Sequence, residues 1–493
     1  MNRTLRVVLE ILVVALAAWQ LADVGLAVSQ RIGANFDLEW MEGATLVTGK
    51  RAAEGLPFYT LPEADYIPFI YPPLYAWVLG ALGQVFPMGY TLGRGVSIVC
   101  AALATGILTV AARREGASWP VALGVGALFV GGYEEGGTFY DLVRIDSLAL
   151  ALAGAALVVA RAESRAAAVV SGLLLAVAFT AKHNMALFGV PIVLWRWRTL
   201  GLRDALTFAA ASAGPALAFT VALQVHTGGL FLTYLLEVPG EHGMVATRAL
   251  PNLAKGRIEG AQAELWRALP ITTTLGVLTA WAWARTRAGG YWAGVLVTGL
   301  VMVSLMRGHQ GGYLNVLIPM LWALPLLAVL PLRALSGDTG WRAWTPHALT
   351  ALLAAQLWEG RGELKKFVPT PQDAAAAAAL VEELRGMPGP VLMPHGPWYP
   401  VMAGHEPSFA LIALWDIDHA GGPFEKGSRV VDRALRDARW NTVVTPDDKL
   451  GHGFLEHYER AAAVGGRPFG TRTGWGVRFR HVWRPKSAET PPE

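Results

Sequence analysis

The chain has 493 residues, of which 53% are hydrophobic and only 16% are charged, and its formal net charge is +4. Soluble domains carry about 25% charged residues, whereas the mean hydropathy here is +0.38. These values exclude a disordered protein, a collagen-like fibre and a typical soluble enzyme, and they favour a polytopic membrane protein. The single cysteine, Cys100, excludes a disulfide framework and a cysteine zinc site.

About eleven apolar segments have roughly the length that a membrane-spanning helix needs. The first follows Arg3 and Arg6 and is longer than the apolar part of a signal peptide, so it predicts a signal anchor. The predicted spans are 5–28, 88–112, 118–134, 146–161, 166–181, 184–197, 203–226, 268–285, 290–306, 314–332 and 344–358. They predict a mainly α fold, a polytopic transmembrane helical bundle.

The segment 71–87, YPPLYAWVLGALGQVFP, is apolar but short, and two prolines follow its first residue. It fits either a further span or a helix in the membrane interface, where Tyr71, Tyr75 and Trp77 are favourable. If it does not span, the arginine-containing loops all lie on the N-terminal side, as the positive-inside rule requires. We therefore predict an interfacial helix, a cytoplasmic N-terminus and outer loops at 29–70, 134–146, 227–267 and 307–313.

Residues 359–493 differ in composition from residues 1–358. They hold most of the lysines, many acids and short β-like runs such as PVLMP, interleaved with helical stretches such as DAAAAAALVEELR. We predict a transmembrane module over 1–358 and a small C-terminal α/β extracytoplasmic domain over 359–493.

Three carboxylates follow the first span on the predicted outer face. Asp37, Glu39 and Glu42 lie in NFDLEWMEG, and the two glutamates are three residues apart, on one face of a helix. Carboxylates beside a bilayer can remove a proton from a nucleophile or hold a hard divalent cation. The alternative is a solvated acidic loop.

Further polar groups lie at the ends of later spans on the same face. Arg144 precedes the span over 146–161, and Asp146 is its first residue. The two side chains are either functional or form a structural ion pair. Lys182 and His183 interrupt an apolar run, and a lysine there either holds a phosphate or extends to the interface.

The loop RGHQGGYLN contains Arg307, His309 and Asn315. Its glycines let backbone donors approach a ligand, and the Arg307 guanidinium matches a phosphate. A single histidine such as His309 at a span end is more often structural than catalytic. The sequence contains no Walker loop, HExxH, GxSxG or nucleotide fingerprint.

The order of these motifs resembles the membrane glycosyltransferases of the GT-C superfamily. The resemblance is carried by EWMEGATLVTGKRAAEGLPFY, YIPFIYPPLYAWVLGAL, GRGVSIVCAAL, the R-x-D element at 144–146, T-A-K-H at 180–183 and the late G-G-Y-L-N. The chain is similar to dolichyl-phosphate-mannose protein mannosyltransferases and to bacterial lipid A aminoarabinose transferases. Where the family usually has adjacent Asp-Glu, this chain has Met41-Glu42.

This resemblance implies an inverting transfer of a sugar from a polyprenyl phosphate to an acceptor hydroxyl on the outer side of the membrane. It implies that the general base is Glu42 or Glu39, with Asp37 as the third candidate. Asp146 would be the second active-site carboxylate, and Lys182 with Arg307 would hold the lipid phosphate. The remaining substrate-binding candidates are Arg144, His183, His309, Tyr71 and Asn315.

The predicted partners are the polyprenyl-phosphate-linked sugar, the lipid bilayer and an unidentified protein, lipid or glycan acceptor, with no nucleic acid. No cofactor is indicated with certainty, and a divalent cation stays an alternative because a glutamate pair serves as base or ligand. The Arg- and Ala-rich composition suggests a bacterium of high GC content, and therefore the inner membrane with a periplasmic outer face.

The main alternative from another class is a transporter or flippase of a lipid-linked or small polar substrate. Transporters usually place ionisable residues near the bilayer midplane, within broken helices, whereas the predicted spans carry almost no charge at their centres. A structural or sensory membrane protein would leave the polar span ends without a role. A glycosyltransferase therefore fits the sequence best.

Overall fold

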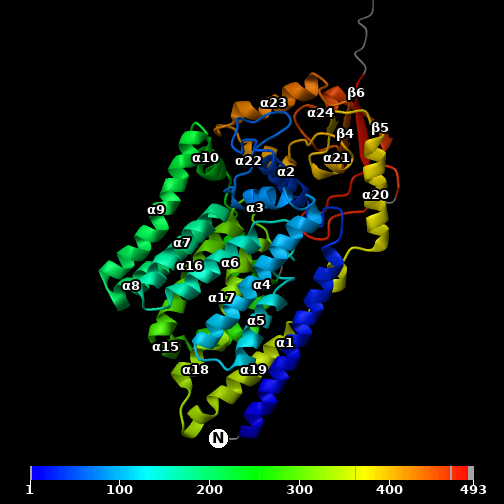
Figure 1. Ribbon diagram of the computed structural model, residues 1–493. Helices are drawn as coiled ribbons and strands as arrows, with labels where there is room; N and C mark the ends of the chain where they lie inside the picture. The colour runs from blue at the N-terminus through cyan, green and yellow to red at the C-terminus, as the bar shows by residue number, and fades with distance from the viewer. Residues whose placement is uncertain (1–2, 255, 361, 467–468, 487–493) are drawn as a thin grey trace, which may run out of the picture.

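The computed structural model describes residues 3–254, 256–360, 362–466 and 469–486. Figure 1 shows a bundle of helices with the C-terminal elements covering one end, opposite the end where the N-terminus lies. Among the described residues, five helices are long and apolar enough to cross a membrane. These are α1 (Arg3–Arg31), α4 (Tyr90–Arg114), α9 (Leu202–His226), α16 (Arg287–Gly308) and the broken helix Leu314–Leu335.

The outer surface of this bundle is apolar, as a lipid-facing surface must be. Ile11 on α1, Leu217 on α9 and Val297 on α16 are each more than 60% exposed. The chain is therefore a multi-pass membrane protein. The broken helix is instead buried in the centre and consists of η3 (Leu314–Leu317), α17 (Ile318–Ala323), η4 (Leu324–Ala328) and α18 (Leu330–Leu335).

The other predicted spans coincide with shorter helices. They are α5 (Trp119–Gly131), α6 (Asp146–Ala160), α7 (Arg165–Ala181), η1 with α8 (His183–Phe188 and Gly189–Leu200), α14 (Pro270–Leu278), α15 (Ala280–Trp283) and α19 (Thr345–Glu359). Small residues bring these helices close together. A Cβ on Gly172 of α7 would lie 2.7 Å from the Cβ of Ala211 on α9.

The ambiguous segment 71–87 forms α3 (Leu74–Gly83), a helix of 10 residues. Ten residues extend about 15 Å, half of the roughly 30 Å hydrocarbon core, so α3 by itself is too short to cross it. The interfacial position stays a prediction. α3 packs on α2 (Glu42–Ala53), because Gly80 allows its backbone to approach Ala52. Both helices lie at the end of the bundle beneath the C-terminal elements (Figure 1).

Short elements build the other loops. They are α10 (Leu230–Leu232), η2 (Thr233–Glu237), α11 (Val238–Gly240), α12 (Ala246–Ala249), the antiparallel strands β1 (Asn252–Ala254) and β2 (Arg257–Glu259), α13 (Ala261–Ala268) and η5 (Gly340–Ala343).

The C-terminal region combines helices with a four-stranded sheet, as the sequence predicted. The helices are η6 (Leu364–Phe367), α20 (Pro371–Arg385), α21 (Trp398–Met402), α22 (Leu411–Ile417), α23 (Glu425–Arg436) and α24 (Phe454–His457). The strands are β3 (Val391–Leu392), β4 (Thr442–Thr445), β5 (Tyr458–Ala463) and β6 (His481–Pro485), in the order β3-β4-β6-β5. Only β3 and β4 are parallel, with Val391 opposite Thr442. The domain division at residue 358 stays a prediction.

The C-terminal region packs directly on the loops at the ends of the spans. The backbone N–H groups of Arg472 and Thr473 donate to the carbonyl oxygen of Leu38, at 2.7 and 3.1 Å. The hydroxyl of Thr473 donates to the carbonyl of Gly137 at 2.6 Å. These bonds fix the loop that carries Asp37, Glu39 and Glu42 against the loop that carries Arg144.

Candidate active site

A cavity of about 600 Å³ lies where the span ends meet the C-terminal region. Its lining includes Glu39, Trp40, Tyr71, Arg144, Lys182, His183, Asn184, His242, His309, Tyr313, Asn315, Trp415, Asp416, His419 and Trp475. These residues come from every polar segment that the sequence singled out on the predicted outer face, and from the C-terminal region. The structure therefore brings most of the predicted site residues together.

Glu39 is the carboxylate of the first loop that lines this cavity. The backbone N–H of Met41 donates to its Oε2 at 3.2 Å, and Nη1 of Arg144 lies 3.5 Å from the same oxygen. Burial raises the pKa of Glu39 to about 7, although the Arg144 guanidinium acts in the opposite direction. A carboxylate with this pKa, held at a cavity wall, is suited to accept a proton near neutral pH.

Glu42 is fully buried and does not line the cavity. Its two oxygens accept from Arg94, at 2.9 and 2.7 Å, and from the backbone N–H groups of Leu38 and Val143, at 2.7 and 3.0 Å. Burial alone would raise the pKa of Glu42, but Arg94 and these N–H donors outweigh it and lower the pKa. Glu42 thus stays ionised and organises the loop, and its geometry does not favour the role of general base.

Asp37 also lies away from the cavity. Its Oδ1 accepts from the backbone N–H of Gly43 at 2.8 Å, and its own N–H donates to the hydroxyl of Tyr399 on α21. Burial, together with the charge of Glu42, raises the pKa of Asp37 well above its usual range. Its contacts attach the first loop to the C-terminal region. Of the three predicted bases, Glu39 is the one that lines the cavity.

Lys182 lines the cavity and forms an ion pair with Asp146, which does not line it. Nζ of Lys182 donates to Oδ1 of Asp146 at 2.7 Å, and the amide of Asn315 donates to the same oxygen at 3.1 Å. Lys182 occupies this place because it ends α7 in an extended conformation before η1 begins. Asp146 therefore pairs with Lys182, and the ion pair with Arg144 considered from the sequence does not form.

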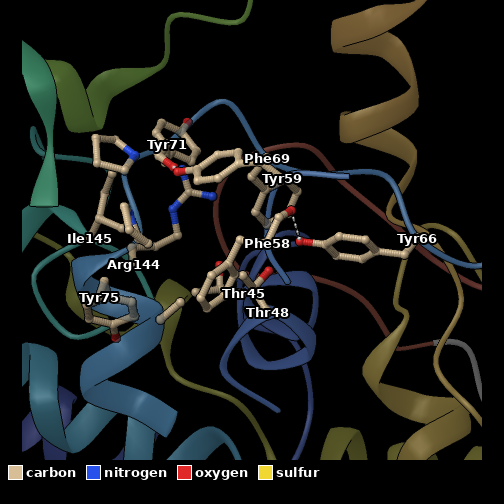
Figure 2. Close-up of a pocket in the computed structure, with 13 residues that line it drawn as sticks. Thr45, Thr48, Phe58, Tyr59, Tyr66, Phe69, Tyr71, Tyr75, Arg144 and Ile145 are labelled. Atoms are coloured by element: carbon tan, nitrogen blue, oxygen red, sulfur yellow. Dashed lines mark hydrogen bonds between the residues drawn. The ribbon is translucent and has the colours of Figure 1, made fainter. Parts of the chain in front are cut away.

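Arg144 lies between the main cavity and a small aromatic crevice of about 40 Å³. Figure 2 shows its side chain extending toward the Tyr71 and Phe69 rings. The hydroxyl of Tyr59 donates to the carbonyl of Tyr71 at 2.7 Å, which fixes the segment before α3. Arg144 is only 7% exposed, and its separation from Glu39 is long for an ion pair. Nη1 of Arg144 also donates to Sδ of Met41 at 2.8 Å, and the guanidinium lies 5.4 Å from the centroid of the Phe139 ring. A guanidinium at a cavity wall is a group that can bind a phosphate.

Arg307, like Asp37, Glu42 and Asp146, is a predicted site residue that does not line the cavity. Its guanidinium donates to both oxygens of Glu264 on α13, at 2.9 and 2.8 Å, and to the carbonyl of Gly312 at 2.7 Å. The geometry therefore does not favour Arg307 as a phosphate ligand, because its donors are already used in holding the loop. Its neighbour His309 does line the cavity.

Several cavity residues were not among the sequence candidates. Trp40, Trp415 and Trp475 form a cluster with ring centroids 5.0–5.9 Å apart. The ring of His242 lies beside those of His309 and His419 in tilted contacts, with centroids 4.9 and 5.0 Å away. The aromatic content of NFDLEWMEG was the available signal for Trp40, but no local pattern links it to residues more than 370 positions later.

Two further titratable groups in the lining, Asp416 and His242, have shifted pKa values. Burial raises the pKa of Asp416 to about 7, and burial lowers the pKa of His242, whose Nε2 lies 3.0 Å from the Asp416 carbonyl. Among the described residues, no group of three or more His, Cys, Asp or Glu side chains is arranged to hold a metal ion, so we assign no metal ligands.

The fold is similar to solved structures of another protein. The crystal structure of ArnT from Cupriavidus metallidurans in the apo state matches with a TM-score of 0.60 and 15% identity, over 94% of this chain and 96% of that chain. ArnT from the same organism bound to undecaprenyl phosphate matches with a TM-score of 0.57 and 14% identity, over 94% and 98%. The chain therefore has the GT-C fold that its motif order indicated. No protein-family model and no curated protein matches the sequence.

Proposed function

We propose that this protein is an integral membrane glycosyltransferase that moves a sugar from a polyprenyl phosphate to an acceptor hydroxyl at the outer face of a bacterial inner membrane. The observation that carries the proposal is the cavity at the span ends, which Glu39, Arg144 and Lys182 line together. The likeness to ArnT, one of whose structures holds undecaprenyl phosphate, supports the same substrate class.

The chemistry follows from what the cavity residues can do. Glu39 accepts the proton of the acceptor hydroxyl as its oxygen attacks the anomeric carbon. The bond from that carbon to the phosphate oxygen breaks, and polyprenyl phosphate leaves with the electron pair. Arg144 and Lys182 stabilise the charge on the phosphate, which needs fixed positive charge more than a proton donor. Attack from the face opposite the phosphate inverts the anomeric configuration.

Asp146 and Asn315 act by positioning Lys182. Asp146 is only 3% exposed, and Lys182 is 11% exposed. Because the pair is formed before substrate arrives, the ammonium is already held at the cavity wall, and less entropy is lost when a phosphate binds. The lipid tail stays in the bilayer while its head reaches the span ends, so the position of the cavity suits a polyprenyl donor.

The test compares purified protein, reconstituted with a labelled polyprenyl-phosphate sugar, with a Glu39→Gln variant. The variant removes the base and keeps the side-chain volume, so we expect turnover to fall about 10²–10⁴-fold while the protein still folds. Glu54→Gln, an exposed acid directly after α2 that pairs with Lys50, is the matched control and should be fully active. Equal turnover by the Glu39 variant would reject the proposed base.

A further inference from the structure

A second cavity, the outer pocket, lies entirely within the C-terminal region. Its volume is about 760 Å³, and all of its lining residues fall between 415 and 457. Residues of α22, α23, α24 and the loop after β4 line it. These elements lie at the end of the bundle opposite the N-terminus (Figure 1). The mechanism above uses none of the charged residues that line it.

The lining of the outer pocket is strongly polar and carries both signs of charge. Its acids are Asp418, Glu425, Asp432 and Glu456, and its bases include Arg429, Arg436 and Lys449. An acyl or polyprenyl chain would desolvate these groups without compensation. A molecule with many hydroxyl groups can donate to the carboxylates and accept from the guanidinium groups at the same time.

The outer pocket and the active-site cavity share a wall. Trp415 and His419 line both. Trp415 is 40% exposed, and Nε2 of His419 is a buried atom without a hydrogen-bond partner among the described residues. A ligand that fills the outer pocket is therefore separated from the cavity lined by Glu39 only by the side chains of these shared residues.

His452 is built into the outer pocket by an unusual loop. It lies between Gly451 and Gly453, and all three residues have positive φ values, with φ of 56° for His452. Nδ1 of His452 lies 2.6 Å from Oδ1 of Asp432, and Nε2 lies 3.4 Å from Oδ2 of Asp418. Non-glycine residues are rare in this backbone region, so the pocket holds its imidazole in place against a local backbone preference.

The tryptophans at the shared wall indicate the class of ligand. The ring centroid of Trp415 lies 5.1 Å from that of Trp475 and 5.9 Å from that of Trp40. Trp40 directly follows Glu39 in the sequence, and both residues line the cavity. Indole rings offer large, flat apolar faces, and the C–H face of a sugar ring can lie on such a surface while its hydroxyls bond polar groups. Aromatic wall and charged pocket together match a carbohydrate.

We propose that the outer pocket binds the acceptor and that this acceptor is a glycan, which enters from the aqueous side while the lipid donor enters from the bilayer. The inference rests on the proposed function. The terminal sugar of the glycan passes Trp415 and presents a hydroxyl to Glu39. That oxygen bonds to the anomeric carbon of the donor sugar, its proton goes to Glu39, and polyprenyl phosphate leaves with the electron pair.

The experiment uses the full-length protein in nanodiscs with labelled polyprenyl-phosphate sugar and three separate acceptor fractions from cell envelopes. The fractions are delipidated and protease-treated glycan, extracted lipid, and delipidated protein. We expect the label to enter the glycan fraction. Label in the lipid or the protein fraction instead would overturn the inference.

Pocket variants complete the test. Arg429→Ala/Arg436→Ala removes two exposed cations of α23, and we expect it to raise the KM for the glycan at least tenfold with an unchanged KM for the donor. Arg433→Ala is the control, because Arg433 lies exposed on the same helix and outside the pocket. If the double variant matches the control, the inference fails and the proposed function stands. If the native protein consumes no donor with any fraction, both fail.

Discussion

The buried pair of Arg94 and Glu42 is predicted to support the loop that carries Glu39. Both side chains have no exposed surface. Besides its two bonds to Glu42, Arg94 donates to the carbonyl oxygens of Arg31 and Phe36, at 3.1 and 2.7 Å. Replacement by methionine keeps most of the side-chain length and removes all of these bonds, so it tests whether the pair fixes the loop between α1 and α2.

The magnitude follows from the contacts. All five hydrogen bonds of the Arg94 guanidinium, two to Glu42 and three to backbone carbonyl oxygens, are charge-assisted and are lost, and the Glu42 carboxylate is left buried without its cation. Removing one partner of a buried pair usually costs about 3–5 kcal/mol, and we expect Arg94→Met to fall in this range. Because Glu42 keeps its backbone N–H donors from Leu38 and Val143, a much larger effect is not expected.

The assay is reversible unfolding in mixed detergent micelles, followed by tryptophan fluorescence. Arg94→Met, Glu42→Gln and the double variant form a thermodynamic cycle, and the double variant should cost about 2–3 kcal/mol less than the sum of the singles. Lys50→Met removes the half-exposed partner of Glu54 and should cost less than about 1 kcal/mol. Additive effects in the cycle, or a cost for Arg94→Met as small as that of Lys50→Met, would refute this reasoning.

Four further outcomes are expected. Because the raised pKa of Glu39 is about 7 and the base acts as carboxylate, kcat/KM should rise about tenfold per pH unit below pH 7 and level off above it; a flat profile from pH 5 to 8 would contradict this. Lys182→Met should lower kcat/KM for the donor about 10²-fold, with partial recovery in Lys182→Arg. Arg307→Met should reduce stability through the lost contacts with Glu264, with the donor KM unchanged in a steady-state assay. Gly474→Ala should lower turnover without changing any charge, because its Cβ would lie 3.0 Å from Cγ of Glu39 at a positive φ; unchanged turnover would show that Glu39 can shift without loss.

Hydropathy made the membrane architecture predictable from the sequence. Each predicted span coincides with one or more helices, and the prolines before Leu74 explain why α3 begins late and stays too short to span. Charge sorted by loop also placed Glu39, Arg144 and Lys182 at the same end of the bundle. The hydropathy of a span is a local property, and the side on which a loop lies follows from the number of spans that precede it. Both can therefore be predicted from a single sequence.

The partners of individual charges could not be predicted in this way. Glu42 and Glu39 look equivalent in NFDLEWMEG. Their environments differ because Arg94, which lies 52 positions from Glu42 along the chain, bonds to Glu42. Arg307 resembled a phosphate ligand in the sequence, but in the structure its guanidinium is bonded to Glu264 on α13. In each case the deciding contact depends on helix packing, which a periodic pattern does not encode.

The C-terminal part of the site was the least accessible to sequence reasoning. Trp415 and Trp475 lie in segments without a recognisable motif. Trp475 is held at the cavity because residues 472–473 bond to Leu38 in the first loop, and the carbonyl of Asp416, next to Trp415, lies 3.0 Å from Nε2 of His242. A region predicted only as a small α/β domain therefore contributes the outer wall of the site.

The central claim is that the cavity at the span ends breaks the bond between a sugar and a polyprenyl phosphate. The most direct measurement is the fate of a doubly labelled donor, with one label in the sugar and one in the lipid, in proteoliposomes of the purified protein with an envelope acceptor fraction. The account predicts that polyprenyl phosphate and glycosylated acceptor appear in equal amounts. Donor that crosses the bilayer with both labels still joined, and no glycosylated acceptor, would contradict it and indicate a flippase.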